Sequence, residues 1–147
     1  MPSRIKLFAT ALAIAVLSGC ASVPMDSPEI DATLKTFPAP PPHQAGLYIY
    51  RDSLGGQSLK KTVKVDGSVI GETANRVYFY RVIAPGPHVI ATESEFSDNN
   101  LDLIAVAGQN HYVRQSIKMG VFVGGADLKI VPASIAQNHL QKCELAK

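Results

Sequence analysis

Residues 60–72 read KKTVKVDGSVIGE, two β-rich runs separated by Asp66-Gly67. Aspartate followed by glycine favours a tight two-residue turn, because glycine readily takes the positive φ that such turns require. The stretch therefore predicts a hairpin in which residues 60–65 and 68–72 form neighbouring antiparallel strands.

Similar β-rich runs recur on both sides of this hairpin, separated by turns rich in Gly, Pro, Asn and Ser. The predicted strands are GLYIYR (46–51), KKTVKV (60–65), SVIGE (68–72), RVYFYRV (76–82), HVIATES (88–94), LDLIAVA (101–107), HYVRQSIK (111–118) and DLKIV (127–131). Seven or eight short strands at this spacing predict a mostly β protein, an antiparallel β-sandwich. Residues 46–147 are enough for one such domain.

One helix is predicted, at the C-terminus. Ser134 and Gln137 have the spacing of a capping box, and Ala136, Leu140 and Cys143 recur at i, i+4 and i+7. This apolar stripe predicts a helix that packs on the sheet and buries Cys143. A lone thiol on such a face behaves as a small hydrophobe.

The N-terminus has the order of a secretory signal: Arg4 and Lys6, an apolar run over residues 7–17, then small residues. The run is too short to span a bilayer. LSGC (17–20) resembles the bacterial lipobox, which implies removal of residues 1–19 and acylation of Cys20 through its sulfur. Ala21 is not the aspartate of an inner-membrane retention signal. The resemblance therefore implies a lipid anchor in the bilayer, on the periplasmic face of the outer membrane.

Residues 20–45 are interpreted as the lipidated cysteine followed by a proline-rich tether. Six of the chain's ten prolines lie between residues 21 and 45, a density that favours an extended polyproline II spacer. Within it, residues 31–37 could form one helical turn that places Leu34 and Phe37 on the domain.

The charge pattern argues against nucleic acid as a partner. The chain has 14 Lys and Arg against 12 Asp and Glu, and Arg4 and Lys6 would leave with the signal. The mature charge is then 12 minus 12, or zero, without a basic cluster of the kind that nucleic acids select.

Few residue patterns indicate catalysis or metal binding. The histidines lack metal-ligand spacing, so neither a metal nor a cofactor is predicted. An envelope glycan or peptide hydrolase that uses Glu93, Glu95 or His88 is kept as the alternative function. Against it, carboxylates on one strand face point the same way rather than across a cleft.

One cluster of tyrosine and arginine is a candidate binding face, because interfaces select these residue types. Alternation places Tyr48 with Tyr50, and Tyr78 with Tyr80, on common strand faces. The alternative is that the tyrosines cover the core with only their hydroxyls in water. The candidate residues are Tyr48, Tyr50, Arg51, Tyr78, Tyr80, Arg81, Tyr112 and Arg114.

The runs AGLYIYR, VDGSVIGE, VYFYRVIAPGPH and HYVRQSIKMGVF resemble the bacterial envelope lipoproteins catalogued as domain of unknown function 2846. The VDGSVIGE hairpin and the later Pro-Gly-Pro-His turn are also similar to carbohydrate-associated PEGA-type domains, which implies a prealbumin-like sandwich. Neither resemblance brings an activity. The expectation is a non-catalytic, membrane-anchored interaction or structural module with an envelope protein or glycan as its partner.

Overall fold

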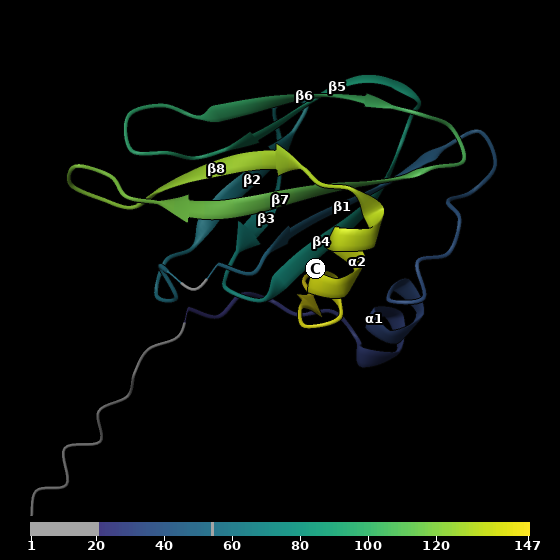
Figure 1. Cartoon of the computed structure of the whole chain (residues 1–147), viewed down its shortest axis with the longest axis horizontal. Coiled ribbons are helices and arrows are strands. Elements are labelled where there is room, and N and C mark those ends of the chain that lie inside the picture. Colours follow the sequence, from purple (N-terminus) through teal and green to yellow (C-terminus); the bar gives the residue numbers. More distant parts are fainter. Residues whose placement is uncertain (1–20, 54) are drawn as a thin grey trace, which may run out of the picture.

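The computed structural model describes residues 21–53 and 55–147, which form nine strands and two helices (Figure 1). Cys20 and the predicted signal of residues 1–19 lie outside the described residues. One sheet has the order β8 (Gly125–Ile130), β7 (Asn110–Lys118), β1 (Ala45–Arg51), β4 (Val77–Ile83) and β9 (Glu144–Leu145). The other has the order β3 (Ser68–Thr73), β2 (Lys61–Val65), β5 (Gly86–Thr92) and β6 (Asn99–Ala105).

The predicted β-sandwich is confirmed, and each of the eight predicted runs overlaps a strand. Five of the seven strand pairings are antiparallel, whereas β1 with β7 and β4 with β9 are parallel. The β1–β7 pair is parallel because the chain crosses to the other sheet between β1 and β4, and again between β4 and β7, whereas β9 reaches β4 through the connection that contains α2. Turn residues mark only local hairpins, so the sequence did not indicate these parallel pairs.

The hairpin between β2 and β3 forms as predicted. Asp66 and Gly67 have φ values of 50° and 80°, and Val65 pairs with Ser68 across the turn. Positive φ at both central residues defines the type I′ turn, whose twist matches that of the flanking strands.

The main core lies between the two sheets. Alternate residues of each strand point into it, including Leu47, Ile49, Val63, Phe79, Ile90, Leu103 and Val113. A buried polar group also crosses this space: Gln115 accepts from the hydroxyl of Thr73 and donates to that of Thr92, 2.6 Å away. Both hydroxyls also reach backbone carbonyls, so the group is satisfied without water.

A third layer covers the outer face of the five-stranded sheet. It consists of α1 (Pro28–Leu34) and α2 (Ala133–Leu140), whose residues Leu34, Ala136 and Leu140 pack with the outward tyrosines of that sheet; both helices lie at the lower right in Figure 1. The sandwich therefore has a second core, between sheet and helices.

The prediction of an extended spacer is wrong for residues 21–37, which lie on the domain. Val23 is buried in the main core, and Met25 forms an isolated bridge with Ala146. Leu34 and Phe37 pack against the second core, as predicted. Apolar residues between the prolines find complementary surface here, which overrides the extended preference of proline.

Both helices differ in their ends from the predicted ones. α1 begins at Pro28 because the side chain of Ser27 accepts from the amide of Ile30, 3.2 Å away. α2 begins at Ala133, directly after Pro132, and Ser134 does not cap it. The helix ends at Leu140, yet Cys143 is buried as predicted, because the chain turns back into β9.

Candidate functional site

The tyrosines of the predicted binding face lie beneath the helices. Tyr48, Tyr50 and Tyr78 have no exposed surface and Tyr112 has 4%, while Tyr80 is half-buried. They share the outer face of the five-stranded sheet, as alternation predicted, but α1, α2 and Phe37 cover that face. The prediction of an exposed binding face is therefore wrong, and the alternative, in which the tyrosine rings cover the core, is correct.

Their hydroxyl groups hold the helices on the sheet. Tyr48 donates to the carbonyl of Leu34 at 3.0 Å, and Tyr78 donates to the carboxylate of Asp31 at 2.8 Å. The side-chain amide of Gln137 donates to the Tyr112 hydroxyl, also at 3.0 Å. Each buried hydroxyl therefore has a protein partner on a covering element, which is how buried tyrosine is normally satisfied.

The rings themselves form one packed group centred on Tyr48. Its ring centroid lies 4.7 Å from that of Tyr80, 5.2 Å from that of Tyr112 and 5.7 Å from that of Phe37. Burial raises the pKa of Tyr48 far above its usual value. Burial, followed by the charge of Asp52, raises the pKa of Tyr50 to about 12. These phenols remain neutral and serve as packing and hydrogen-bonding groups.

Arg51 and Arg81 lie on the opposite face of the sheet from the tyrosines. Arg51 is fully buried, and its guanidinium donates to the carbonyls of Gly56 and Leu59. Arg81 is half-buried, donates to the carbonyl of Ile70 at 3.1 Å, and lies 5.4 Å over the ring of Phe79. The eight predicted residues therefore do not share one surface.

Arg114 is the one predicted arginine on the tyrosine face, and it belongs to a polar cluster that sequence reasoning missed. Its Nε donates to Oδ1 of Asp52 at 2.7 Å. Nδ1 of His139 lies 3.0 Å from the other carboxylate oxygen of Asp52 and 3.2 Å from the Tyr50 hydroxyl. Asp52 follows β1 and His139 lies in the last turn of α2, so only the tertiary fold brings them together.

The thiol of Cys143 lies near the cluster of Asp52, Arg114 and His139, and a thiol can serve as a nucleophile. Sγ of Cys143 is 3.5 Å from the backbone carbonyl of His139 and has no exposed surface. Burial, followed by the negative charge of Asp52, raises the pKa of this thiol to about 12. Because the thiolate is the reactive form, the geometry gives Cys143 a packing role.

The three residues of the hydrolase hypothesis each have a different set of contacts. Glu93 accepts from the hydroxyl of Thr62, and Glu95 accepts from backbone amides of the β7–β8 loop. His88 stands near the start of β5 and Glu93 follows its end, roughly 16 Å away along the strand. Glu95 and His88 line separate surface hollows, so the structure does not bring these residues into one cleft.

Both ring nitrogens of His88 face oxygen acceptors. Nδ1 lies 2.6 Å from the carboxylate of Asp66 and Nε2 lies 2.7 Å from the carbonyl of Ala84. Two acceptors suit the doubly protonated ring. The hydrogen bond with Asp66, followed by that with Ala84, raises the pKa of His88. Both ring nitrogens are therefore engaged by the protein's own oxygens, so neither is directed outward as a general base.

We expect an NMR titration to place the pKa of His88 above its ordinary value, and Asp66→Asn to lower it. Since the folded-state pKa is the raised one, the pair's contribution to stability is present below pH ~6.5 and is lost as the pH rises through that pKa. Asp98→Asn, which removes a carboxylate paired with Lys64 instead, is the charge-matched control. An unchanged His88 titration in Asp66→Asn would contradict the assigned contact.

Comparison with known proteins identifies the family. The model of a family of proteins of unknown function, DUF2846, matches residues 41–126. An uncharacterized protein of Haemophilus influenzae is 46% identical over 144 residues, which cover 96% of this chain and 86% of that protein. The chain belongs to the DUF2846 family. The matched range runs from the segment before β1 to the second residue of β8, so it spans both sheets and ends before α2.

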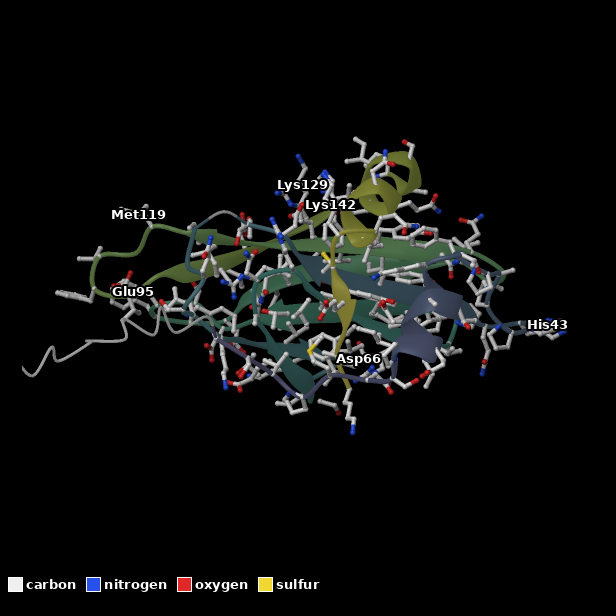
Figure 2. The ribbon with its side chains drawn as sticks, turned by 90° about the horizontal axis from the view of Figure 1, so that it is seen from below. His43, Asp66, Glu95, Met119, Lys129 and Lys142 are labelled. Atoms are coloured by element: carbon white, nitrogen blue, oxygen red, sulfur yellow. The ribbon has the colours of Figure 1, made fainter. Side chains whose placement is uncertain are left out.

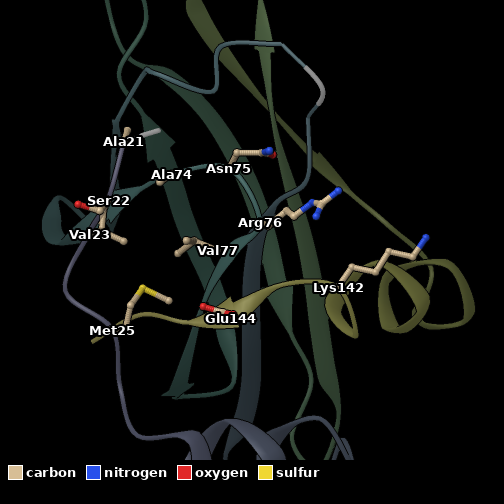
Figure 3. A pocket seen from close by; sticks show the side chains of 10 residues that line it. All are labelled: Ala21, Ser22, Val23, Met25, Ala74, Asn75, Arg76, Val77, Lys142 and Glu144. Atoms are coloured by element: carbon tan, nitrogen blue, oxygen red, sulfur yellow. The ribbon is translucent and has the colours of Figure 1, made fainter. Parts of the chain in front are cut away.

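The described part of this DUF2846 protein begins beside a shallow surface hollow of about 360 Å³. Residues 21–25 form one side of it and residues 74–77 face them, with Lys142 and Glu144 completing the lining (Figure 3). Ala21 lies at one edge of the hollow in this view. Within residues 21–53 and 55–147, no helix has the length and apolar character needed to span a membrane.

Proposed function

We propose that this DUF2846 protein is a lipid-anchored protein of the bacterial envelope whose β-sandwich acts as a non-catalytic structural or binding module. The anchor is the acylated Cys20, and the site is the periplasmic face of the outer membrane. The observation that carries the proposal is the LSGC motif at residues 17–20, which stands directly after an apolar run with a positive start.

The contacts after Cys20 support a domain held close to the bilayer. The amide of Ala21 donates to the carbonyl of Gln57 at 3.2 Å, and Val23 is buried in the main core. A lipid attached at Cys20 would therefore be one residue away from the folded domain. A lipid in this position would have no long spacer between it and the domain.

The buried groups support a module whose role is structural or binding. The tyrosine hydroxyls, the guanidinium of Arg51 and the thiol of Cys143 all make internal contacts that stabilise the fold. The partner we expect is an envelope protein or glycan. Such a partner would meet surfaces other than the covered tyrosine face.

The anchor is tested by Cys20→Ala. The variant should lose incorporation of radioactive palmitate and accumulate as an uncleaved precursor, because the acceptor sulfur is gone. Cys143→Ala is the matched control, since the chain has two cysteines and Cys143 is buried. It should be labelled and processed as the natural protein is.

The proposed role in the envelope is tested in cells that lack the protein or produce the same variants. Cells without the protein should be more sensitive to detergent and osmotic stress, and the natural chain should restore them where Cys20→Ala does not. Normal labelling and processing of Cys20→Ala would refute the anchor. An unaltered envelope in cells without the protein would count against the structural role.

A further inference from the structure

Two neighbouring loops expose five large apolar side chains at one end of the sandwich. This apolar tip consists of Phe96 in the β5–β6 loop and Met119, Val121, Phe122 and Val123 in the β7–β8 loop. Met119 is 98% exposed, Phe122 83%, Phe96 78% and Val121 76%, and these are the four most exposed large apolar side chains among the described residues. Contiguous exposed apolar side chains mark an interaction site.

The conformation of the tip is fixed by specific contacts. The carboxylate of Glu95 accepts hydrogen bonds from the amides of Val121, at 2.6 Å, and Phe122. A third bond comes from the amide of Val123 at 3.4 Å. Desolvation raises the pKa of Glu95, but these amide bonds outweigh it, and the pKa lies below its usual range.

Gly120 allows the tight turn that these bonds require. A Cβ atom there would lie 1.6 Å from the carbonyl oxygen of Val123, so no larger residue fits without moving the backbone. The loop therefore turns its amides toward Glu95 and its apolar side chains outward. This orientation suits contact with an apolar phase, in which unpaired amides are costly.

The apolar tip and the start of the described chain border the same loop. Residues 55–59 line a hollow together with residues 117–124 of the β7–β8 hairpin. The same loop accepts the amide of Ala21 through the carbonyl of Gln57. Figure 2 places Met119 and Glu95 at one end of the molecule and His43 at the other, and the purple chain start lies toward the hairpin side in Figure 1.

We propose that the apolar tip inserts into the surface of the bilayer that holds the lipid of Cys20. This inference rests on the proposed anchor. The partner is the lipid, because the proposed attachment point adjoins the loop that supports the tip. Phenylalanine and methionine side chains would enter about 5–10 Å into the boundary between headgroups and acyl chains. Together with the lipid, they would fix the orientation of the sandwich on the membrane.

The test measures the fluorescence of a single introduced tryptophan. The protein is processed, labelled with palmitate and reconstituted in vesicles of equal parts phosphatidylcholine and phosphatidylglycerol. The chain has no tryptophan, so Phe122→Trp supplies the only indole signal. Vesicles with acyl-brominated lipid should blue-shift and quench its emission, most strongly with bromine near the headgroup. Phe96→Trp should respond similarly. Ile104→Trp is the control, because Ile104 is 66% exposed on β6, near the end away from the β5–β6 loop.

The outcomes separate this inference from the anchor. Quenching in Phe122→Trp with little in Ile104→Trp supports insertion, and Glu95→Ala in the Phe122→Trp background should then reduce it. If the protein is labelled and bound to vesicles but the indole at the tip is not quenched, the proposed insertion is refuted and the proposed anchor is retained. A blue shift without bromolipid quenching indicates cover by a second copy and also overturns it. Absence of palmitate label removes the anchor and the inference together.

Discussion

Tyr48→Ala should lower the free energy of unfolding by about 3 to 5 kcal/mol, the range for truncating a fully buried aromatic side chain. The ring of Tyr48 packs against the rings of Tyr80, Tyr112 and Phe37, and its hydroxyl donates to Leu34 at the end of α1. The substitution leaves a cavity between sheet and helices. Urea denaturation of the natural chain and the variant measures the difference.

Two further variants divide this loss into its parts. Tyr48→Phe keeps the ring and removes one hydrogen bond, so we expect a loss of about 1 kcal/mol. Tyr80→Ala removes a half-buried ring from the same face and should cost less than Tyr48→Ala. Equal stability of Tyr48→Ala and the natural chain would mean that the helices do not cover this face in solution.

The strands were predictable because their signals are local. Alternation of apolar residues and the Asp66-Gly67 turn are contained within a few positions, and both follow from backbone sterics. The ninth strand, Glu144–Leu145, is too short to carry a periodic pattern. The parallel pairing of β1 with β7 depends on where the chain crosses between sheets, which local signals do not encode.

The sequence carries one signal for the third layer. In LYIY (47–50), both faces of the strand are apolar or aromatic, and a strand of this kind is typically covered on both sides. The frequency of tyrosine at interfaces makes Tyr48 and Tyr50 candidates for a binding surface, whereas the alternative, that they cover the core, agrees with their burial. The helices that bury them stand at opposite ends of the chain, so the cover depends on tertiary contacts.

The polar groups were the least predictable part. Arg51 and Arg114 are both arginines, yet Arg51 is buried against backbone carbonyls, whereas Arg114 pairs with Asp52 near the surface. Asp52, which joins Arg114 and His139, lies in a loop that carries no recognisable motif. The identity of a polar residue does not reveal its partners when these come from distant segments.

Arg51→Ala should destabilise the domain by roughly 2 to 5 kcal/mol, because it removes a buried side chain and leaves buried carbonyls without a donor. The guanidinium of Arg51 donates to Leu59 at 2.7 Å and to Gly56, and its Nε donates to Ser53 at 3.3 Å. These contacts close the loop between β1 and β2. Thermal and urea denaturation measure the loss.

The same loop accepts the amide of Ala21 and lies against the β7–β8 hairpin, so the effect should extend beyond stability. Hydrogen exchange in Arg51→Ala should increase at residues 21–23 and 117–124 before it increases in the strands of the main core. Arg51→Lys keeps the charge but not the fork of donors, and should recover only part of the loss. Arg81→Ala, from a half-buried arginine on the same sheet face, is the matched control and should leave exchange at these two segments unchanged. If Arg51→Ala and Arg81→Ala behave alike, Arg51 does not hold the loop, and the link between chain start and apolar tip must come from other contacts.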